Sequence, residues 1–245
     1  MNEKMKAKAE LENGSKQNLA ANYQSILTLI KTYAKTHKRS FEPKLLAVSK
    51  GHSIEAIKAI ADLGQVRFGE NYAQELLDKA SKTSDTPIEF VFIGHLQSNK
   101  IKKIVSVAAE IQTVGTYDQA RRIAKAAEDF GKTPFPIYLQ VNADAEAAKH
   151  GVSLSELQPL YDKITRELPE LLVKGIMAIP SPRHSKAFET EGKISELYLD
   201  LRQKTNLIGQ KHLSLGTTSD IELAIIAGTD ELRIGTALFG PRNKQ

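Results

Sequence analysis

The sequence contains no cysteine, and it has no long hydrophobic run. Without cysteine, disulfides, thiolate metal sites and cysteine nucleophiles are excluded, and a cytoplasmic location is the natural expectation. The longest apolar runs, at residues 90–93 and 223–227, are far too short to span a bilayer, so no membrane segment is expected. Six histidines are present, but their spacing does not match that of paired metal ligands, so we predict no metal site.

Charge is not concentrated in one part of the chain. The net charge of the 245 residues is +5, and the only dense basic cluster consists of Lys35, Lys38 and Arg39. Because no aromatic residues are interleaved with it, this cluster favours the end of a helix over a nucleic-acid site, and no nucleic-acid partner is expected. A mildly basic chain still favours small anionic ligands.

The first sixteen residues differ from the rest of the chain. Residues 1–16 alternate lysine with glutamate and have no apolar core, which is not the pattern of a signal peptide. We expect them to form a flexible, solvated extension. No linker, low-complexity tract or long Gly/Pro/Ser stretch divides the remaining sequence, so residues 17–245 are predicted to form a single domain.

Short apolar segments alternate with stretches of helical periodicity throughout this domain. A short continuous apolar run is typical of a strand that is buried on both faces, as in a parallel sheet covered by helices. The alternation of eight strands with eight helical segments predicts an α/β fold, a single (β/α)₈ TIM barrel, with a doubly wound open sheet as the alternative. The predicted strands are residues 45–49, 66–69, 89–94, 111–114, 136–141, 174–178, 212–215 and 232–235.

The helices are predicted from apolar residues at helical spacing. The first has Leu19, Tyr23, Ile26, Ile30 and Tyr33 on one face. The second follows the first strand and is expected to have Ser53 as its N-cap. The remaining helices are expected at residues 72–80, 98–108, 117–130, 154–168, 187–204 and 221–227.

Lys50 follows the first predicted strand, at the end where α/β proteins place their ligands. An ammonium group is costly to desolvate, so burial at this place would favour the neutral, nucleophilic amine. Such an amine forms imines with aldehydes and ketones. The alternative is a strand-end lysine whose charged tip reaches solvent.

The loops after the last two predicted strands combine glycine with small hydroxyl residues, as Gly216-Thr217-Thr218 and Gly235-Thr236. Glycine lets backbone N–H groups approach an anion, hydroxyls add donors, and a helix begins directly afterwards. These two loops are the usual phosphate site of a (β/α)₈ barrel. We therefore predict a phosphorylated ligand, although ordinary turns and N-caps have the same composition.

Two further polar residues each have two interpretations. Arg233 ends the last predicted strand and needs a partner, because arginine is seldom buried alone. That partner is either a structural carboxylate or an uncharged ring nitrogen of a ligand. Asn71 either contacts the ligand or caps the helix that follows it.

Six motifs, in this order along the chain, resemble those of the pyridoxal phosphate homeostasis proteins. The resemblance extends from about residue 20 to residue 242. The motifs are Ala47-Val48-Ser49-Lys50, Phe68-Gly69-Glu70-Asn71-Tyr72, the segment from Phe92 to Lys100, Gly175-Ile176-Met177-Ala178-Ile179-Pro180, Leu213-Ser214-Leu215-Gly216 and the segment from Arg233 to Gly240.

The resemblance implies a single barrel similar to the N-terminal domain of alanine racemase (fold type III), which binds pyridoxal 5′-phosphate (PLP). It implies that Lys50 holds the cofactor aldehyde as a Schiff base, that Arg233 faces the pyridine nitrogen, and that Asn71 lies beside the ring. The residues implied around the phosphate are Ser214, Gly216, Thr218, Gly235 and Thr236. The sequence departs from the family pattern at Gly51-His52 and at Thr217-Thr218.

By this resemblance we expect a cytoplasmic, monomeric PLP carrier that delivers the cofactor to apoenzymes, with little or no turnover. An arginine at the ring nitrogen stays charged and donates no proton, so the ring is a weak electron sink. Racemisation also needs two acid–base groups. Lys50 is one, but Tyr72, the candidate for the second, is expected to pack against a helix instead. The alternatives are a PLP-dependent amino-acid racemase and a Schiff-base aldolase without cofactor.

Overall fold

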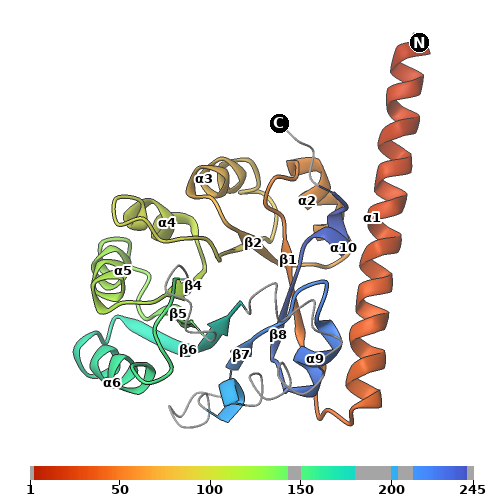
Figure 1. Cartoon of the computed structure of the whole chain (residues 1–245). Coiled ribbons are helices and arrows are strands. Elements are labelled where there is room, and N and C mark those ends of the chain that lie inside the picture. Colours follow the sequence, from red (N-terminus) through yellow and green to blue (C-terminus); the bar gives the residue numbers. More distant parts are fainter. Residues whose placement is uncertain (1–2, 143–149, 180–199, 204–211, 242–245) are drawn as a thin grey trace.

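The computed structural model describes residues 3–142, 150–179, 200–203 and 212–241, with side chains from residue 18 onward. Eight parallel strands form a closed barrel, in which each strand pairs with the next and β8 pairs with β1 (Figure 1). The predicted (β/α)₈ barrel is therefore confirmed. The strands are β1 (Lys44–Val48), β2 (Arg67–Glu70), β3 (Glu89–Phe92), β4 (Glu110–Val114), β5 (Phe135–Val141), β6 (Leu171–Ala178), β7 (His212–Ser214) and β8 (Glu231–Ile234).

Side chains on each strand alternate between the barrel interior and the layer of helices. Leu46, Val48, Val91 and Ile93 form a small separate cluster of buried residues. The intervening residues of the strands, such as Ala47, belong to the large hydrophobic core that also contains helix residues. This alternation decides which strand residues can reach the inside of the barrel.

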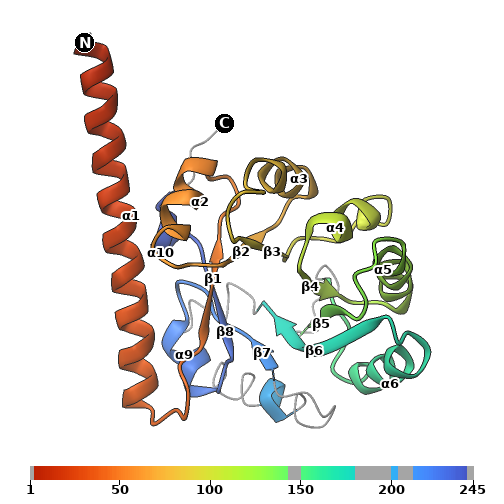
Figure 2. The same cartoon turned by 180° about the vertical axis from the view of Figure 1, so that it is seen from behind.

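Helices surround the barrel (Figures 1 and 2). Ser53 caps α2 as predicted, since its hydroxyl accepts a hydrogen bond from the backbone N–H of Ala56. Of the helix predicted at residues 187–204, only residues 200–203 are described, and they are helical. The helices are α1 (Glu3–Thr36), α2 (Ile54–Ala61), α3 (Ala73–Lys82), α4 (Ile101–Val107), α5 (Tyr117–Asp129), α6 (Leu157–Glu167), α9 (Ile221–Ile226) and α10 (Thr236–Phe239).

Helix α1 runs along one side of the barrel, where it contacts α2, α9 and α10 (Figure 2). Its predicted apolar face is confirmed, because Leu19, Tyr23, Ile26 and Ile30 are buried. The helix begins at Glu3, and its amino-terminal part extends beyond the barrel in both views. The flexibility expected for residues 1–16 stays a prediction.

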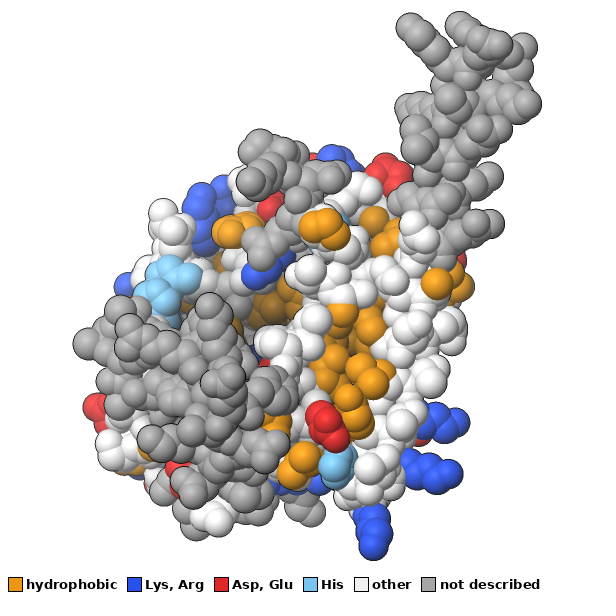
Figure 3. All heavy atoms as spheres, turned by 45° about the vertical axis from the view of Figure 1, so that its right-hand side comes forward, with side chains coloured by type: hydrophobic (Ala, Val, Ile, Leu, Met, Phe, Trp, Pro, Cys, Tyr) orange, Lys and Arg blue, Asp and Glu red, His pale blue; other side chains and the backbone are white. Residues whose placement is uncertain are grey.

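No helix in the described part of the chain combines the length and the apolar character that crossing a membrane requires. Within the same residues there is no group of three or more His, Asp or Glu side chains arranged to hold a metal ion. On the face shown in Figure 3, Lys and Arg side chains lie mainly around the margin and do not form one continuous patch.

Candidate functional site

A cavity of about 340 Å³ lies at the carboxyl ends of the barrel strands. Six of the eight site residues predicted from the sequence line this cavity: Lys50, Asn71, Thr218, Arg233, Gly235 and Thr236. They come from the segments that follow or end β1, β2, β7 and β8. The closure of the barrel therefore brings together residues that are far apart in the sequence.

Lys50 is half-buried, two residues after the end of β1. The strand is held on both sides, because Val48 pairs with Gly69 of β2 and Leu46 pairs with Arg233 of β8. The backbone N–H of Ser49 still donates to the carbonyl of Gly69, at 3.0 Å, so strand pairing continues to the residue before Lys50. Lys50 thus stands at the point where the chain leaves the sheet.

Arg233 is 4% exposed, and three hydrogen bonds to neutral oxygen atoms hold its guanidinium. Its Nη1 donates to the carbonyl and the hydroxyl of Ser214, at 2.7 and 2.8 Å, and its Nη2 donates to the carbonyl of Ala178, at 2.8 Å. Glu231, two residues earlier on β8, has its pKa raised by burial, and the charge of Arg233 opposes this shift. These bonds fix the guanidinium in the cavity wall without neutralising its positive charge.

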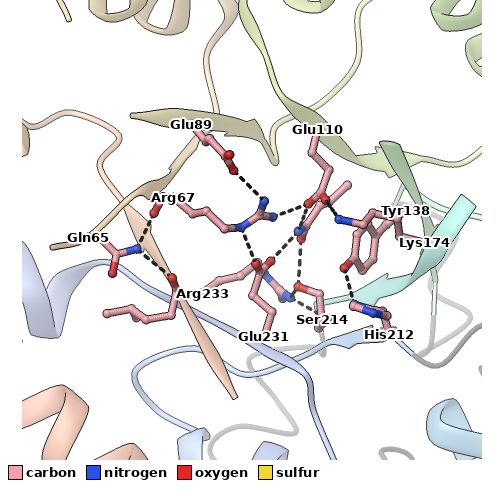
Figure 4. Close-up of polar contacts among 12 residues, drawn as sticks. Gln65, Arg67, Glu89, Glu110, Tyr138, Lys174, His212, Ser214, Glu231 and Arg233 are labelled. Carbon is pink, nitrogen blue, oxygen red and sulfur yellow. Dashed lines mark hydrogen bonds and ion pairs between the residues drawn. The ribbon is translucent and has the colours of Figure 1, made fainter. Parts of the chain in front are cut away.

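A chain of polar contacts continues from Arg233 through the barrel interior (Figure 4). The Ser214 hydroxyl donates to Gln112 Oε1 at 2.9 Å, and Gln112 Nε2 donates to Glu231 Oε1 at 2.5 Å. Glu231 in turn accepts from Arg67 Nε at 3.1 Å. Ser214 therefore lies behind Arg233 and supports it, and it is not among the residues that line the cavity.

The interior chain ends in a buried charge cluster around Arg67. Its guanidinium contacts Glu231, Glu110 at 2.7 Å and Glu89 at 3.4 Å. Burial alone would lower the pKa of Arg67, but the charges of Glu231 and Glu110 outweigh burial and raise it. Lys174 adds a second cation, 3.3 Å from Glu110. Because these side chains are paired, the barrel interior can contain several charges.

The glycines of the two predicted phosphate loops differ in position. Gly235 lines the cavity, and a Cβ added there would lie 3.2 Å from the carbonyl oxygen of Val48. Gly216 does not line the cavity. Its φ is +95°, and a Cβ would lie 2.5 Å from Leu232 and 2.6 Å from Ala224. Gly216 is thus required by the close packing of the loop against β8 and α9.

The loop after β7 is tied to the start of α9 by a carboxylate. Asp220 Oδ1 accepts from the backbone N–H of Thr217 at 2.6 Å and from its hydroxyl at 2.7 Å. Thr217 therefore uses two donors within the protein. Thr218 and Ser219 also line the cavity, with Thr236 on the loop after β8.

Asn71 does not cap the helix that follows it, so the capping interpretation was wrong. The N-cap of α3 is Tyr72, which makes no side-chain capping bond. Asn71 lines the cavity instead, and its Oδ1 atom is buried without a hydrogen-bond partner in the part of the chain that the structure describes. A buried amide oxygen without a partner is costly, so this atom is suited to a ligand that donates to it.

The expected packing role of Tyr72 was also wrong, because the residue is 56% exposed. Thr217, which belongs to the predicted phosphate loop, also lines the cavity. Four further lining residues were not predicted, namely Val48, Ile93, Ile179 and Ser219. Val48 and Ile93 were detectable in principle. Each lies at an inward-facing position near the carboxyl end of its strand, as strand alternation requires.

Comparison with known proteins gives consistent matches. A family model described as "Alanine racemase, N-terminal domain" matches residues 15–243. The pyridoxal phosphate homeostasis protein of Escherichia coli K12 is 39% identical over 210 residues, which cover 82% of this chain and 87% of the relative. The chain belongs to the pyridoxal phosphate homeostasis protein family. The family member from Pseudomonas aeruginosa PAO1 is 37% identical over 201 residues, which cover 81% and 84% of the two chains.

Solved structures agree with membership of the pyridoxal phosphate homeostasis protein family. PipY of Synechococcus elongatus PCC7942, solved with PLP bound, is 26% identical, and the superposition has a TM-score of 0.72. The match covers 86% of this chain and 100% of PipY. Several alanine racemases share the fold at 14–15% identity. Their likeness to this chain concerns the fold alone.

Proposed function

We propose that this protein binds PLP in the cavity at the carboxyl ends of the strands and functions in PLP homeostasis. The observation that carries the proposal is the position of Lys50, Asn71 and Arg233 on one cavity, together with hydroxyl residues of the loops after β7 and β8. Homologues named for PLP homeostasis, and PipY solved with PLP bound, support the same cofactor.

The residues present fit this cofactor. The buried Oδ1 atom of Asn71 lacks a partner among the described residues, and the wall at Gly235 is tight enough that a Cβ would approach the carbonyl of Val48. A lysine amine suits an aldehyde, and hydroxyl and backbone donors suit a phosphate. When bound, PLP supplies an electron sink for carbanions formed on amino acids.

Each residue has a defined part in the proposal. Lys50 would hold the aldehyde of PLP through its Nζ as a Schiff base. Arg233, which is fixed by its bonds to Ser214 and Ala178, would face the ring nitrogen. Because it stays charged, it keeps that nitrogen unprotonated. Thr218, Gly235 and Thr236 would lie around the phosphate. Ser214 and Gly216, which the family resemblance also implies around the phosphate, lie outside the cavity lining, where Ser214 holds Arg233 and Gly216 packs against Leu232.

The cavity favours a carrier over a racemase. Lys50 is the one side chain suited to proton transfer among the described residues that line the cavity. Tyr72 is exposed and is not part of that lining. We therefore propose that the protein holds PLP, releases it to apoenzymes by exchange of amines at Lys50, and has little or no turnover. A monomeric state and a cytoplasmic location complete the proposal, and both rest on the sequence analysis.

The test is a spectroscopic titration of the purified protein with PLP. Visible imine absorbance is expected in the wild type and not in the variant Lys50→Ala. The absence of imine absorbance in the wild type would refute PLP binding at this site. The racemase alternative is tested by following α-proton exchange of amino acids in heavy water by NMR. Sustained exchange that depends on Lys50 would overturn the carrier proposal, whereas imine formation with aldehydes but not PLP would favour a cofactor-free aldolase.

A further inference from the structure

A group of three ionisable side chains, two of them buried, lies directly behind Lys50, outside the cavity. Glu70 ends β2, and Glu75 and Lys79 lie on α3. We refer to these three residues as the β1 clamp. The Glu70 side chain is fully buried and that of Lys79 nearly so, whereas the Glu75 side chain is 34% exposed.

The ammonium group of Lys79 has three hydrogen-bond acceptors. It donates to the backbone carbonyl of Ser49 at 2.8 Å, to Glu70 Oε1 at 2.7 Å and to Glu75 Oε2 at 2.9 Å. An ammonium group has three donors, so this arrangement satisfies the buried charge. One of the three bonds is made to the backbone of the residue that precedes Lys50.

The clamp also holds the residue that follows Lys50. The backbone N–H of Gly51 donates to Glu75 Oε2 at 2.8 Å, and the Ser49 hydroxyl donates to Glu70 Oε1 at 2.6 Å. Gly51 has a φ of +72°, a left-handed conformation that glycine adopts without strain. Lys50 is therefore the residue between two neighbours whose polar groups are both bound to the clamp.

The ionisation of the clamp follows from its contacts. Burial raises the pKa of Glu70, and the charge and hydrogen bond of Lys79 oppose this shift. Burial alone would raise the pKa of Glu75 as well, but the hydrogen bonds from Gly51 and Lys79 outweigh it and lower the pKa. Glu75 is thus ionised at neutral pH and accepts two strong hydrogen bonds on one oxygen atom.

We propose that Glu70, Glu75 and Lys79 are positioning residues that fix the backbone on both sides of Lys50 and thereby slow the exchange of a bound aldehyde from its amine. The proposal rests on the cofactor role proposed above for Lys50. A positioned amine returns readily to the same carbon, whereas a mobile one is displaced by a competing amine. The clamp would therefore control how long PLP stays bound.

The experiment measures exchange with hydroxylamine in the PLP-loaded full-length protein. The nitrogen of hydroxylamine bonds to the imine carbon and gives two protons to Lys50 Nζ. The bond from that carbon to Nζ breaks, which leaves an oxime and the free amine of Lys50. Loss of the visible absorbance gives the rate. Glu75→Ala loses the hydrogen bonds from both Gly51 and Lys79, so we expect exchange to be at least roughly tenfold faster, since the loss of one hydrogen bond to a charged group already corresponds to about that factor. Glu75→Gln, which keeps an acceptor oxygen, is expected to restore most of the wild-type rate.

Asp78→Ala is the matched control, because Asp78 pairs with Lys82 on the exposed side of the same helix, at 2.7 Å. It should exchange at the wild-type rate. Ser49→Ala, which removes a single contact of the clamp, should show a smaller increase and serves if Glu75→Ala does not fold. Wild-type rates in Glu75→Ala or Ser49→Ala, or an equal increase in Asp78→Ala, would overturn the proposal. A wild-type protein without imine absorbance would refute the cofactor role itself, so the two failures are distinguishable.

Discussion

Replacing Arg67 by methionine would remove the main cation that two buried carboxylates share. Arg67 lies 2.7 Å from Glu110 and 3.1 Å from Glu231, whose side chains are 1% and 5% exposed. Its contact with Glu89 is longer, and that carboxylate is half exposed, so it contributes little. Breaking a buried ion pair by removing one partner costs about 3–5 kcal/mol. At about 2–4 °C per kcal/mol for a domain of this size, the melting temperature should fall by about 6–20 °C.

The loss of stability in Arg67→Met should depend on pH in a defined direction. Burial raises the pKa of Glu231, and Arg67 is the first group that opposes this shift. A carboxyl whose folded pKa lies above its unfolded value, about 4.3, lowers stability as the pH rises above that value. Without Arg67 the pKa of Glu231 rises further. The decrease in the free energy of unfolding caused by Arg67→Met should therefore be larger at about pH 7.5 than at about pH 5.

The assay is urea unfolding of the wild type and of Arg67→Met at both pH values, followed by circular dichroism. Arg122→Met is a suitable control, because Arg122 pairs with Asp118 on the surface, where both side chains are about half exposed. It should change the free energy of unfolding by less than about 1 kcal/mol. The reasoning would be refuted if Arg67→Met decreased the free energy of unfolding by less than about 1 kcal/mol, or if the decrease were not smaller at the lower pH.

Three further predictions concern packing and the site. Ser53→Ala should lower the free energy of unfolding by about 1 kcal/mol in thermal denaturation, because the capping bond to Ala56 is lost; an unchanged midpoint would contradict this. Gly216→Ala should lower the free energy of unfolding by about 1–3 kcal/mol, because the positive φ and the contact with Leu232 both oppose a Cβ. Unfolding of this variant at the wild-type midpoint would contradict that strain. Arg233→Met should weaken PLP binding by about tenfold or more in an absorbance titration, because the fixed cation is removed; equal affinity would exclude the proposed contact with the ring.

Much of the barrel was predictable because its signals are local. Each strand is a short apolar run, and each loop is marked by glycine or a capping residue, so the elements can be recognised one at a time. The position of Lys50 at the carboxyl edge follows from its own strand alone. Parallel strands between helices then predict that the other strand ends lie at the same edge.

The features that could not be predicted depend on which side chains meet across the barrel. The support of Arg233 by Ser214 and Gln112 joins β8, β7 and β4, and it follows only from closure and register. The β1 clamp requires α3 to pack against the ends of β1 and β2, a contact that no local pattern encodes. The roles of Asn71 and Tyr72 depend on where α3 starts, and helix ends are uncertain by a residue or two in any sequence-based assignment.

The pairing of β1 with β8 has a consequence for synthesis of the chain. Lys50 leaves the ribosome well before the neighbouring strand that holds Arg233, and the two come together only when Leu46 pairs with Arg233. Such a contact between distant segments forms late and slowly in folding. A nascent or truncated barrel without β8 has the reactive amine but lacks one wall of its cavity. Stable retention of the cofactor should therefore report that the barrel has closed.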